Sequence, residues 1–202
     1  MKGTPMARPR SDTPRAADRI LSVANARFTA EGSRAIGVDE IVARAGTTKP
    51  TLYRAFGSKD GLIAAWMTQS ADAVWMALEA GVAARPDDPK AQLLAAFDAL
   101  NVDDARGCTL SNTVVEYPAR KHAGRKVAVV HKERVRERLR DLTRAINARK
   151  PRKLADSLLL LLEGTAMARQ IFGTEGPSEA ARGAAEALIA AHIRRDKSDD
   201  ED

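Results

Sequence analysis

The sequence has 202 residues, of which 44% are hydrophobic, 4% aromatic and 30% charged, and it carries a formal net charge of +6. This composition supports a folded core rather than a disordered chain, and the single cysteine, Cys108, excludes a fold held by intramolecular disulfides. No apolar run reaches membrane-spanning length and residues 1–20 contain no apolar signal segment, so we expect no membrane association and a cytoplasmic location.

The amino-terminal segment combines an irregular arm with a first helix. Residues 1–13 mix Gly, Pro, Ser and Arg without periodicity and are predicted to form a flexible basic arm. Thr13 as cap and Pro14 in the first turn begin a helix over 14–31, and Gly32 ends it. Apolar residues at helical spacing give this helix one buried face.

Two short helices follow, separated by a glycine turn. The first covers residues 38–45, with Gly37 at its cap and Glu40 placed to reach back to the exposed amides. Gly46 makes the turn, and Thr48 caps the second helix, which ends before Gly57. Ser58 then caps a longer helix.

The rest of the chain has helical periodicity throughout. No alternating strand pattern of useful length is present, so the sequence predicts an all-α protein of about nine helices. The later segments with helical patterns are 89–100, 108–117, 120–148, 152–172 and 178–194. We expect a helix-turn-helix domain over 14–57, an antiparallel helical bundle over 58–195 and an acidic tail over 196–202.

The two short helices have the spacing of a DNA-reading helix-turn-helix. In such a motif the second helix enters the major groove with a polar face while apolar residues anchor it from behind. Leu52 and Phe56, four residues apart, fit the buried side. The polar side then consists of Lys49, Thr51, Tyr53 and Arg54, and Lys59 near the start of the next helix suits a backbone phosphate.

This region resembles the TetR family of transcriptional regulators. The resemblance covers roughly residues 15–66 and rests on Phe28, Gly32, Val38, Ile41, Ala45, Gly46, Thr51, Leu52, Tyr53, Phe56, Lys59 and Leu62. It implies that Lys49, Pro50 and Thr51 lie near bases, that Tyr53 and Lys59 bind phosphates and that Arg54 contacts either. Two departures are Gly37, where the family usually has Thr or Ser, and Ala55, where some members have a larger contacting side chain. Arg8, Arg10 and Arg15 fit either a DNA contact or a solvated arm.

Five consecutive leucines, 158–162, place apolar groups all round one helix of the second domain. One side can face the core of the same subunit, so the other side predicts a homodimer built as a four-helix bundle, and the resemblance implies the same interface. A monomer that buries all five leucines is the alternative. The expected interface residues are Leu158, Leu159, Leu162, Ala184, Leu188 and Ala191.

An effector pocket is expected among the middle helices, lined mainly by apolar residues with a few polar groups. The candidates are Trp66, Phe97, Asn112, Glu116, His131, Met167 and Gln170. The segment from Gly107 to Asn112 resembles a Gly-Cys block of one branch of the family. Cys108 fits a buried structural residue better than a thiol sensor.

The sequence therefore predicts a ligand-responsive regulator, expected to be a repressor, with a palindromic operator and a small-molecule effector as partners. We expect no enzyme activity, no metal and no cofactor, because metal-spaced ligands, a phosphate loop and a catalytic constellation are all missing from the sequence. The basic block 120–153 is interpreted as a solvated helix face and not a second nucleic-acid site. A helical enzyme or carrier and a regulator without a ligand remain the alternatives.

Overall fold

The structure is a computed structural model that describes residues 13–101, 107–173 and 175–193. Within these ranges every regular element is helical, which confirms the all-α prediction of about nine helices. The α-helices are α1 (Thr13–Glu31), α2 (Val38–Arg44), α3 (Lys49–Phe56), α4 (Lys59–Ala83), α5 (Pro89–Leu100), α6 (Thr109–Glu116), α7 (Ala123–Ala145), α8 (Pro151–Phe172) and α9 (Ala181–His192). The predicted tail 196–202, and the arm apart from Thr13, lie outside the described residues.

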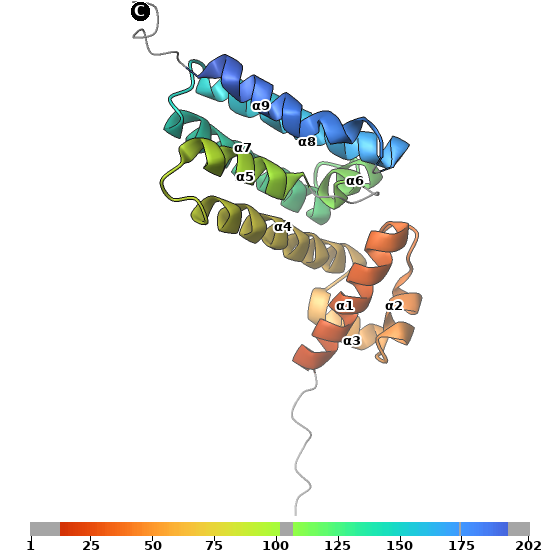
Figure 1. Cartoon of the computed structure of the whole chain (residues 1–202). Helices are drawn as coiled ribbons and strands as arrows, with labels where there is room; N and C mark the ends of the chain where they lie inside the picture. The colour runs from red at the N-terminus through yellow and green to blue at the C-terminus, as the bar shows by residue number, and fades with distance from the viewer. Residues whose placement is uncertain (1–12, 102–106, 174, 194–202) are drawn as a thin grey trace, which may run out of the picture.

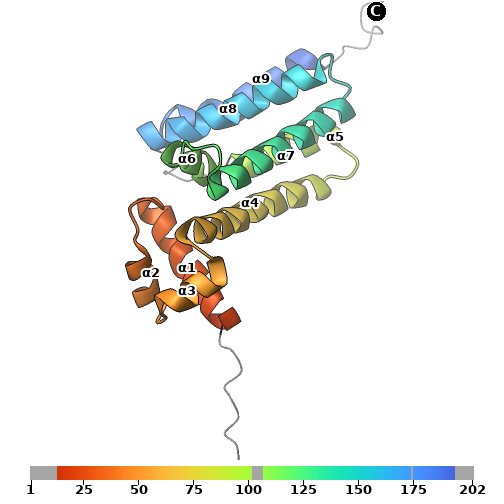
Figure 2. The same ribbon diagram turned by 180° about the vertical axis from the view of Figure 1, so that it is seen from behind.

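The helices form a small group at one end of the molecule and a layered bundle at the other. Figure 1 shows α1, α2 and α3 gathered at the amino-terminal end of α4, which leads away from them into the bundle. Helices α5 and α7 lie beside α4, and α8 and α9 form the layer farthest from the small group (Figures 1 and 2). Helix α4 therefore joins the two parts of the molecule.

The small group has its own apolar core, which includes the first half of α4. Ile20, Ile41 and Leu52, from α1, α2 and α3, are fully buried together with residues of α4. The ring of Phe28 packs edge-on against Trp66 of α4 with centroids 5.2 Å apart. Because burying each large apolar side chain contributes about 1.5–3 kcal/mol, this core fixes the three short helices against α4.

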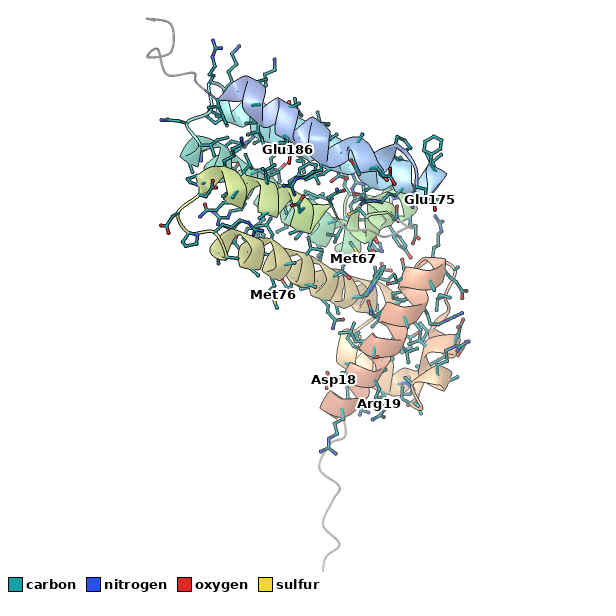
Figure 3. The ribbon with its side chains drawn as sticks, viewed as in Figure 1. Asp18, Arg19, Met67, Met76, Glu175 and Glu186 are labelled. Carbon is teal, nitrogen blue, oxygen red and sulfur yellow. The ribbon has the colours of Figure 1, made fainter. Side chains whose placement is uncertain are left out.

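A second core fills the bundle between the end of α4, α5, α7, α8 and α9. Phe97, Leu139 and Leu158 are all fully buried there. At Gly124, near the start of α7, a Cβ atom would lie only 2.9 Å from Ile63 Cγ2, so the glycine permits close approach of α7 to α4. Figure 3 shows the side chains that fill the spaces between these helices, with Met76 on the opposite, exposed side of α4.

Several predicted helix ends are confirmed and others differ. Ser58 caps α4, since its Oγ accepts a hydrogen bond from the Gly61 amide at 3.0 Å. Thr48 occupies the cap position of α3 but makes no side-chain cap bond; its Oγ1 instead hydrogen-bonds Thr51 Oγ1 at 3.0 Å. Glu40 does not reach back to the α2 amides either, because two arginines hold it. Its Oε1 accepts from Arg27 Nε at 2.7 Å and Arg44 Nε at 3.0 Å.

The long basic helix and the last helix are shorter than predicted. The described helix α7 starts at Ala123 and ends at Ala145, inside the predicted range 120–148. Residues Pro177–Ala180 form a 3-10 turn, η1, before α9, where the sequence pattern predicted the start of the last α-helix. The physical reason is local, since Pro177 lacks an N–H and begins a tight turn that α9 continues.

Candidate DNA-binding surface and ligand cavity

The turn between α2 and α3 is held by backbone geometry and by a contact from α1. Gly46 has φ +58°, a left-handed conformation that non-glycine residues rarely adopt. The preceding residue, Ala45, is buried, and its carbonyl oxygen accepts a hydrogen bond from Arg19 Nε of α1 at 3.2 Å. These contacts set the direction in which α3 leaves the turn.

Helix α3 has one buried and one open side, as its sequence predicts. Leu52 is fully buried and Phe56 is half-buried against the same core. On the other side Lys49, Pro50 and Arg54 are exposed, Tyr53 is 46% exposed and Thr51 is half-buried. The polar residues predicted to contact DNA therefore lie together on the open side of α3.

Lys49 is paired with an acidic residue that the sequence analysis did not consider. Its Nζ lies 2.7 Å from Oδ1 of Asp39 on α2. The hydrogen bond and the charge of Asp39 raise the pKa of Lys49 above its ordinary value. No sequence pattern predicts contact between Asp39 and Lys49. The pair is seen only once α2 and α3 are packed together.

Lys59 lies at the start of α4, where it contacts the loop between α1 and α2. Its Nζ donates to the carbonyl oxygen of Arg34 at 3.4 Å. Partial burial lowers its pKa, against the opposing effects of Asp60 and Glu116. The hydrogen bond to Arg34 therefore holds the positive charge of Lys59 beside the amino end of α4.

The same loop is bound to the end of α6. Glu116 Oε2 accepts from Ser33 Oγ at 2.7 Å and from the Arg34 amide at 3.2 Å. Gly32, with φ +83°, leaves space for this carboxylate, because an added Cβ would lie 2.5 Å from Glu116 Oε1. Helix α6 is thus attached to the amino-terminal group.

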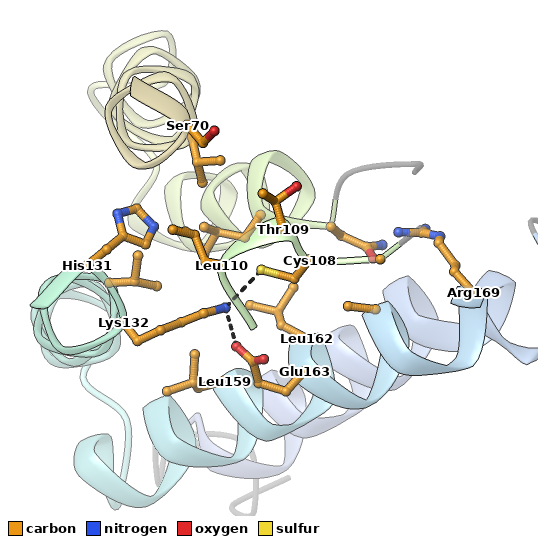
Figure 4. Close-up of a pocket in the computed structure, with 16 residues that line it drawn as sticks. Ser70, Cys108, Thr109, Leu110, His131, Lys132, Leu159, Leu162, Glu163 and Arg169 are labelled. Carbon is orange, nitrogen blue, oxygen red and sulfur yellow. Dashed lines mark hydrogen bonds and ion pairs between the residues drawn. The ribbon is translucent and has the colours of Figure 1, made fainter. Parts of the chain in front are cut away.

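The other end of α6 borders a cavity in the bundle. The cavity has a volume of about 230 Å³ and is bounded by α4, α5, α6, α7 and α8. Figure 4 shows Lys132 of α7 between Cys108 Sγ, at 3.4 Å, and the carboxylate of Glu163 on α8. Glu163 also accepts from Ser111 Oγ at 2.7 Å. Although burial alone lowers the pKa of Lys132, Cys108 and Glu163 raise it above its ordinary value.

His131, the neighbour of Lys132, lines the same cavity on the side facing α4. Its residue is only 6% exposed, and Figure 4 shows its ring directed from α7 towards Ser70. Burial, followed by the positive charges of Lys132 and Arg134, lowers its pKa to about 4, although Asp72 acts in the opposite direction. The imidazole is therefore neutral at pH 7.

The geometry of α1 to α4 agrees with a known family. Residues 20–66 match the family model described as "Bacterial regulatory proteins, tetR family". That range includes the whole α2–α3 motif and its support on α4. Residues 20–66 therefore form a TetR-type DNA-binding domain.

Two curated relatives match part of the chain. Two uncharacterized HTH-type transcriptional regulators from Mycobacterium tuberculosis strains, MT1294 and Rv1255c, are each 44% identical over 52 residues. The match covers 26% of this chain and 26% of each relative. The similarity to these proteins is thus confined to about a quarter of their length.

Solved structures of TetR-family regulators extend the similarity to most of the chain. SCO4454 from Streptomyces coelicolor is 26% identical, with a TM-score of 0.81, and the alignment covers 90% of this chain and 97% of that one. A TetR-family regulator from Cytophaga hutchinsonii is 22% identical with a TM-score of 0.79, covering 94% and 100%. The arrangement of the described helices is therefore a TetR-type fold in the bundle as well.

Of the seven residues predicted to line an effector pocket, only His131 lines this cavity of the TetR-type bundle. Trp66 is buried in the amino-terminal core, with its Nε1 bonded to Asn25 Oδ1, and Phe97 is buried in the bundle core. Glu116 binds the α1–α2 loop and Met167 is 51% exposed. Asn112 and Gln170 hydrogen-bond each other at 3.0 Å.

The cavity residues missed from the sequence are mainly Lys132 and Glu163. Lys132 lies in the basic block that was interpreted as a solvated face, and Glu163 lies on the leucine-rich helix, 31 residues further along the chain. Cys108 and Leu110, from the block that resembles one branch of the family, do line the cavity. No periodicity distinguishes an inward ion pair from an outward one.

The predicted subunit interface is only partly on the surface. Leu158 and Leu162 are buried in the core of the same subunit, and Leu159 lines the cavity and packs against that core. The exposed leucine is Leu160, which begins a stripe that continues along α8. The stripe also contains Gly164, Met167 and Ile171. On α9, Ala184 is half-buried beside Leu160 and Gly164, and Ala191 is exposed. Leu188 is half-buried against the bundle core.

Within the described residues, no group of three or more His, Cys, Asp or Glu side chains could hold a metal ion. In the same part of the chain, none of the helices has both the length and the apolar character needed to cross a bilayer.

Proposed function

We propose that this chain is a ligand-responsive transcriptional repressor of the TetR family, which acts in the bacterial cytoplasm as a homodimer on a palindromic operator. The observation that carries the proposal is the two-sided helix α3. Leu52 is fully buried behind it, while Lys49, Tyr53 and Arg54 are exposed in front. A short helix anchored in this way can place its polar side in the major groove.

The individual residues have different expected roles. Lys49, Pro50 and Thr51, at the start of α3, would lie near base edges, because the amino-terminal end of a recognition helix enters the groove. Tyr53 and Lys59 would bind phosphates, and Arg54 would contact either a base or a phosphate. The exposure of Tyr53 and the position of Lys59 beside the α4 amino end support these roles.

Dimer formation is supported by the apolar stripe on α8. Leu160 is 73% exposed and Ile171 64% exposed, at spacings that place them on one side of the helix. The small residues of α9 beside them permit close helix approach, so two copies of α8 and α9 can form a four-helix bundle around a two-fold axis. Such a dimer presents two α3 helices to half-sites about 34–36 Å apart.

Ligand-dependent release is supported by the position of α6 between the cavity and the DNA-binding group. Leu110, near its start, lines the cavity, and Glu116, at its end, binds Ser33 and Arg34. A ligand that shifts α6 would therefore pull on the α1–α2 loop and change the spacing of the two recognition helices. The cavity also argues against a regulator that responds to no ligand.

The test is selection of bound duplexes from a random DNA pool by the purified full-length protein. We expect recovery of a palindrome with two equal half-sites, bound in a salt-sensitive manner. Recovery of no common sequence, with equal retention of selected and random duplexes, would contradict the proposal and favour a helical carrier or enzyme.

A further inference from the structure

The cavity in the bundle has mainly apolar walls and one polar side. Val74, Leu100, Leu110, Val135 and Leu162 contribute apolar side chains from five different helices. The polar side is formed on α7 by His131 and Lys132, with Glu163 and Arg169 on α8 (Figure 4). A site of this kind binds an apolar body and orients it through a few polar groups.

The charges of Lys132 and Glu163 compensate each other inside the cavity. One oxygen of Glu163 pairs with Lys132 Nζ, and the other accepts from Ser111 Oγ at 2.7 Å. Lys132 Nζ also lies 3.4 Å from Cys108 Sγ. A ligand carboxylate that binds Lys132 would have to displace Glu163, and a ligand ammonium that binds Glu163 would have to displace Lys132. Either exchange leaves one protein charge without its partner beside mainly apolar walls, in side chains that are 30% and 34% exposed, which is unfavourable.

His131 provides a hydrogen-bonding group that the protein itself does not use. The residue is only 6% exposed and lines the cavity, and no hydrogen bond joins its ring to another residue in the part of the chain that the structure describes. Because the ring is neutral at pH 7, one nitrogen carries a proton and can donate a hydrogen bond, and the other nitrogen can accept a hydrogen bond. Buried polar groups normally have partners, so an unused imidazole in a cavity wall points to a ligand that supplies one.

We propose that the effector cavity of the proposed function takes an uncharged, mainly apolar molecule with one hydroxyl or carbonyl oxygen that hydrogen-bonds His131. A cavity of about 230 Å³ accommodates on the order of a dozen non-hydrogen atoms. This inference rests on the proposed function only in treating the bound molecule as an effector. The preference for an uncharged ligand follows from the cavity itself.

The test compares three probes that share one apolar body and differ in charge. The probes are 4-phenylbutan-1-ol, 4-phenylbutanoate and 4-phenylbutan-1-amine, titrated calorimetrically into the full-length protein at pH 7.5 without DNA. We expect the alcohol to bind at least about tenfold more tightly than either charged probe. A carboxylate or amine that binds as tightly as the alcohol, or no binding by any of the three, overturns the inference.

Two charge variants should change the preferred probe in opposite ways, one towards the carboxylate and one towards the amine. Glu163→Gln leaves Lys132 without its counter-ion, so the carboxylate should become the preferred probe. Lys132→Met leaves Glu163 unpaired, so the amine should become the preferred probe. The matched control is Glu133→Gln on α7, since the side chain of Glu133 is 60% exposed and pairs with Arg136 at 3.6 Å, away from the cavity pair; it should keep the wild-type order. Unchanged probe order in both charge variants contradicts the inference, and if they fail to fold, the wild-type series alone decides it.

A third variant tests the hydrogen bond itself. His131→Leu replaces the imidazole by an apolar side chain that fills the wall but makes no hydrogen bond. Affinity for the alcohol should therefore fall by about fivefold or more, which corresponds to one lost hydrogen bond. Unchanged affinity for the alcohol in this variant contradicts the assigned role of His131.

The same protein and probes separate this inference from the proposed function. Binding is measured without DNA, whereas release is measured by adding the alcohol to the complex with the selected palindrome. Tight binding of the alcohol without release contradicts ligand-driven release and leaves the ligand class standing. Release by the charged probes alone supports ligand-driven release and contradicts the ligand class.

Discussion

Among single residues, the ion pair between Lys49 and Asp39 bears most directly on DNA binding. Asp39 has a side chain that is 81% exposed, on the same side of the motif as the polar positions of α3. A carboxylate in this place repels phosphates and holds Lys49 at the same time. We therefore expect it to lower the affinity for DNA that the other basic residues provide.

The variant Asp39→Asn should bind both selected and random duplexes about three- to tenfold more tightly, because one repulsive charge is removed and Lys49 becomes available to DNA. Fluorescence anisotropy at several salt concentrations measures the change. Asp87→Asn, in the exposed loop between α4 and α5, is the matched control and should leave affinity unchanged. An affinity equal to that of the wild-type protein would count against a DNA surface at this position.

Tyr53 and Thr51 are expected to differ in what they contribute. Tyr53→Phe removes one hydroxyl from a phosphate contact and should weaken binding to every duplex by about fivefold, or roughly 1 kcal/mol. Thr51→Ala should instead change which base is preferred within the half-site. Competition with single-base variants of the selected palindrome distinguishes the two effects. Equal loss on all duplexes for both variants contradicts the assignment of Thr51 to base contact.

His131 makes the free energy of unfolding depend on pH. Its pKa is about 4 in the folded protein and 6.5 in the unfolded chain, so the unfolded state binds more protons between these values. Its contribution is complete above pH 6.5 and decreases as pH falls towards 4. Between pH 7.5 and pH 5 the loss amounts to about 2 kcal/mol.

Urea unfolding at fixed protein concentration measures this effect. His131→Leu should lose about 2 kcal/mol less than the wild-type protein when the pH is lowered from 7.5 to 5. His192→Leu, near the end of α9, serves as the control. An identical pH dependence for wild type and His131→Leu would show that the residue is not held neutral by burial.

Among the elements, α3 and α8 differ in how well the sequence pattern predicts which side of the helix is buried. The spacing of Leu52 and Phe56 defines one buried side of α3, and the glycines at 46 and 57 define its limits, so the orientation of this helix could be predicted. In α8 five leucines leave no polar residue to mark the outer side. Which of them faces outward depends on packing against α7 and α9, and Leu160 emerged only from the fold.

The exposed position of Leu160 gives a test of the dimer. Leu160→Glu places a charge in the proposed interface and should weaken the dimer by at least about tenfold, equivalent to about 1.4 kcal/mol. Sedimentation analysis over a range of concentrations measures the shift. Met76→Glu is the control, because Met76 is 67% exposed on α4 and outside the α8–α9 face. A wild-type dimer constant for Leu160→Glu would exclude this face as the interface.

Within the whole molecule, α6 connects two regions that no local pattern links. Ser33 and Glu116 are 83 positions apart, and Lys132 and Glu163 are 31 apart, so both contacts depend on the complete arrangement of helices. The sequence could identify the DNA-binding motif because its signals are local. It could not identify the cavity residues, since their pairing arises only when α6, α7 and α8 come together.

The connection through α6 predicts a separation of ligand binding from release. Glu116→Ala removes the acceptor for Ser33 and Arg34, so ligand should bind the cavity with unchanged affinity but release the operator at least about threefold less effectively. Calorimetry with 4-phenylbutan-1-ol and anisotropy with the selected palindrome provide the two readings. Val115→Ala, on the exposed side of α6, should behave as the wild-type protein. Full release in Glu116→Ala would require another route of communication.

The central claim is that the exposed side of α3 lies against base pairs. Site-specific photo-crosslinking tests it directly, with a benzophenone side chain placed at Arg54 and, as control, at Met76 on α4. We expect position 54 to crosslink to bases within each half-site of the selected duplex and position 76 to give no DNA adduct. Adducts from position 76 alone, or none from position 54 on a bound duplex, would contradict the account.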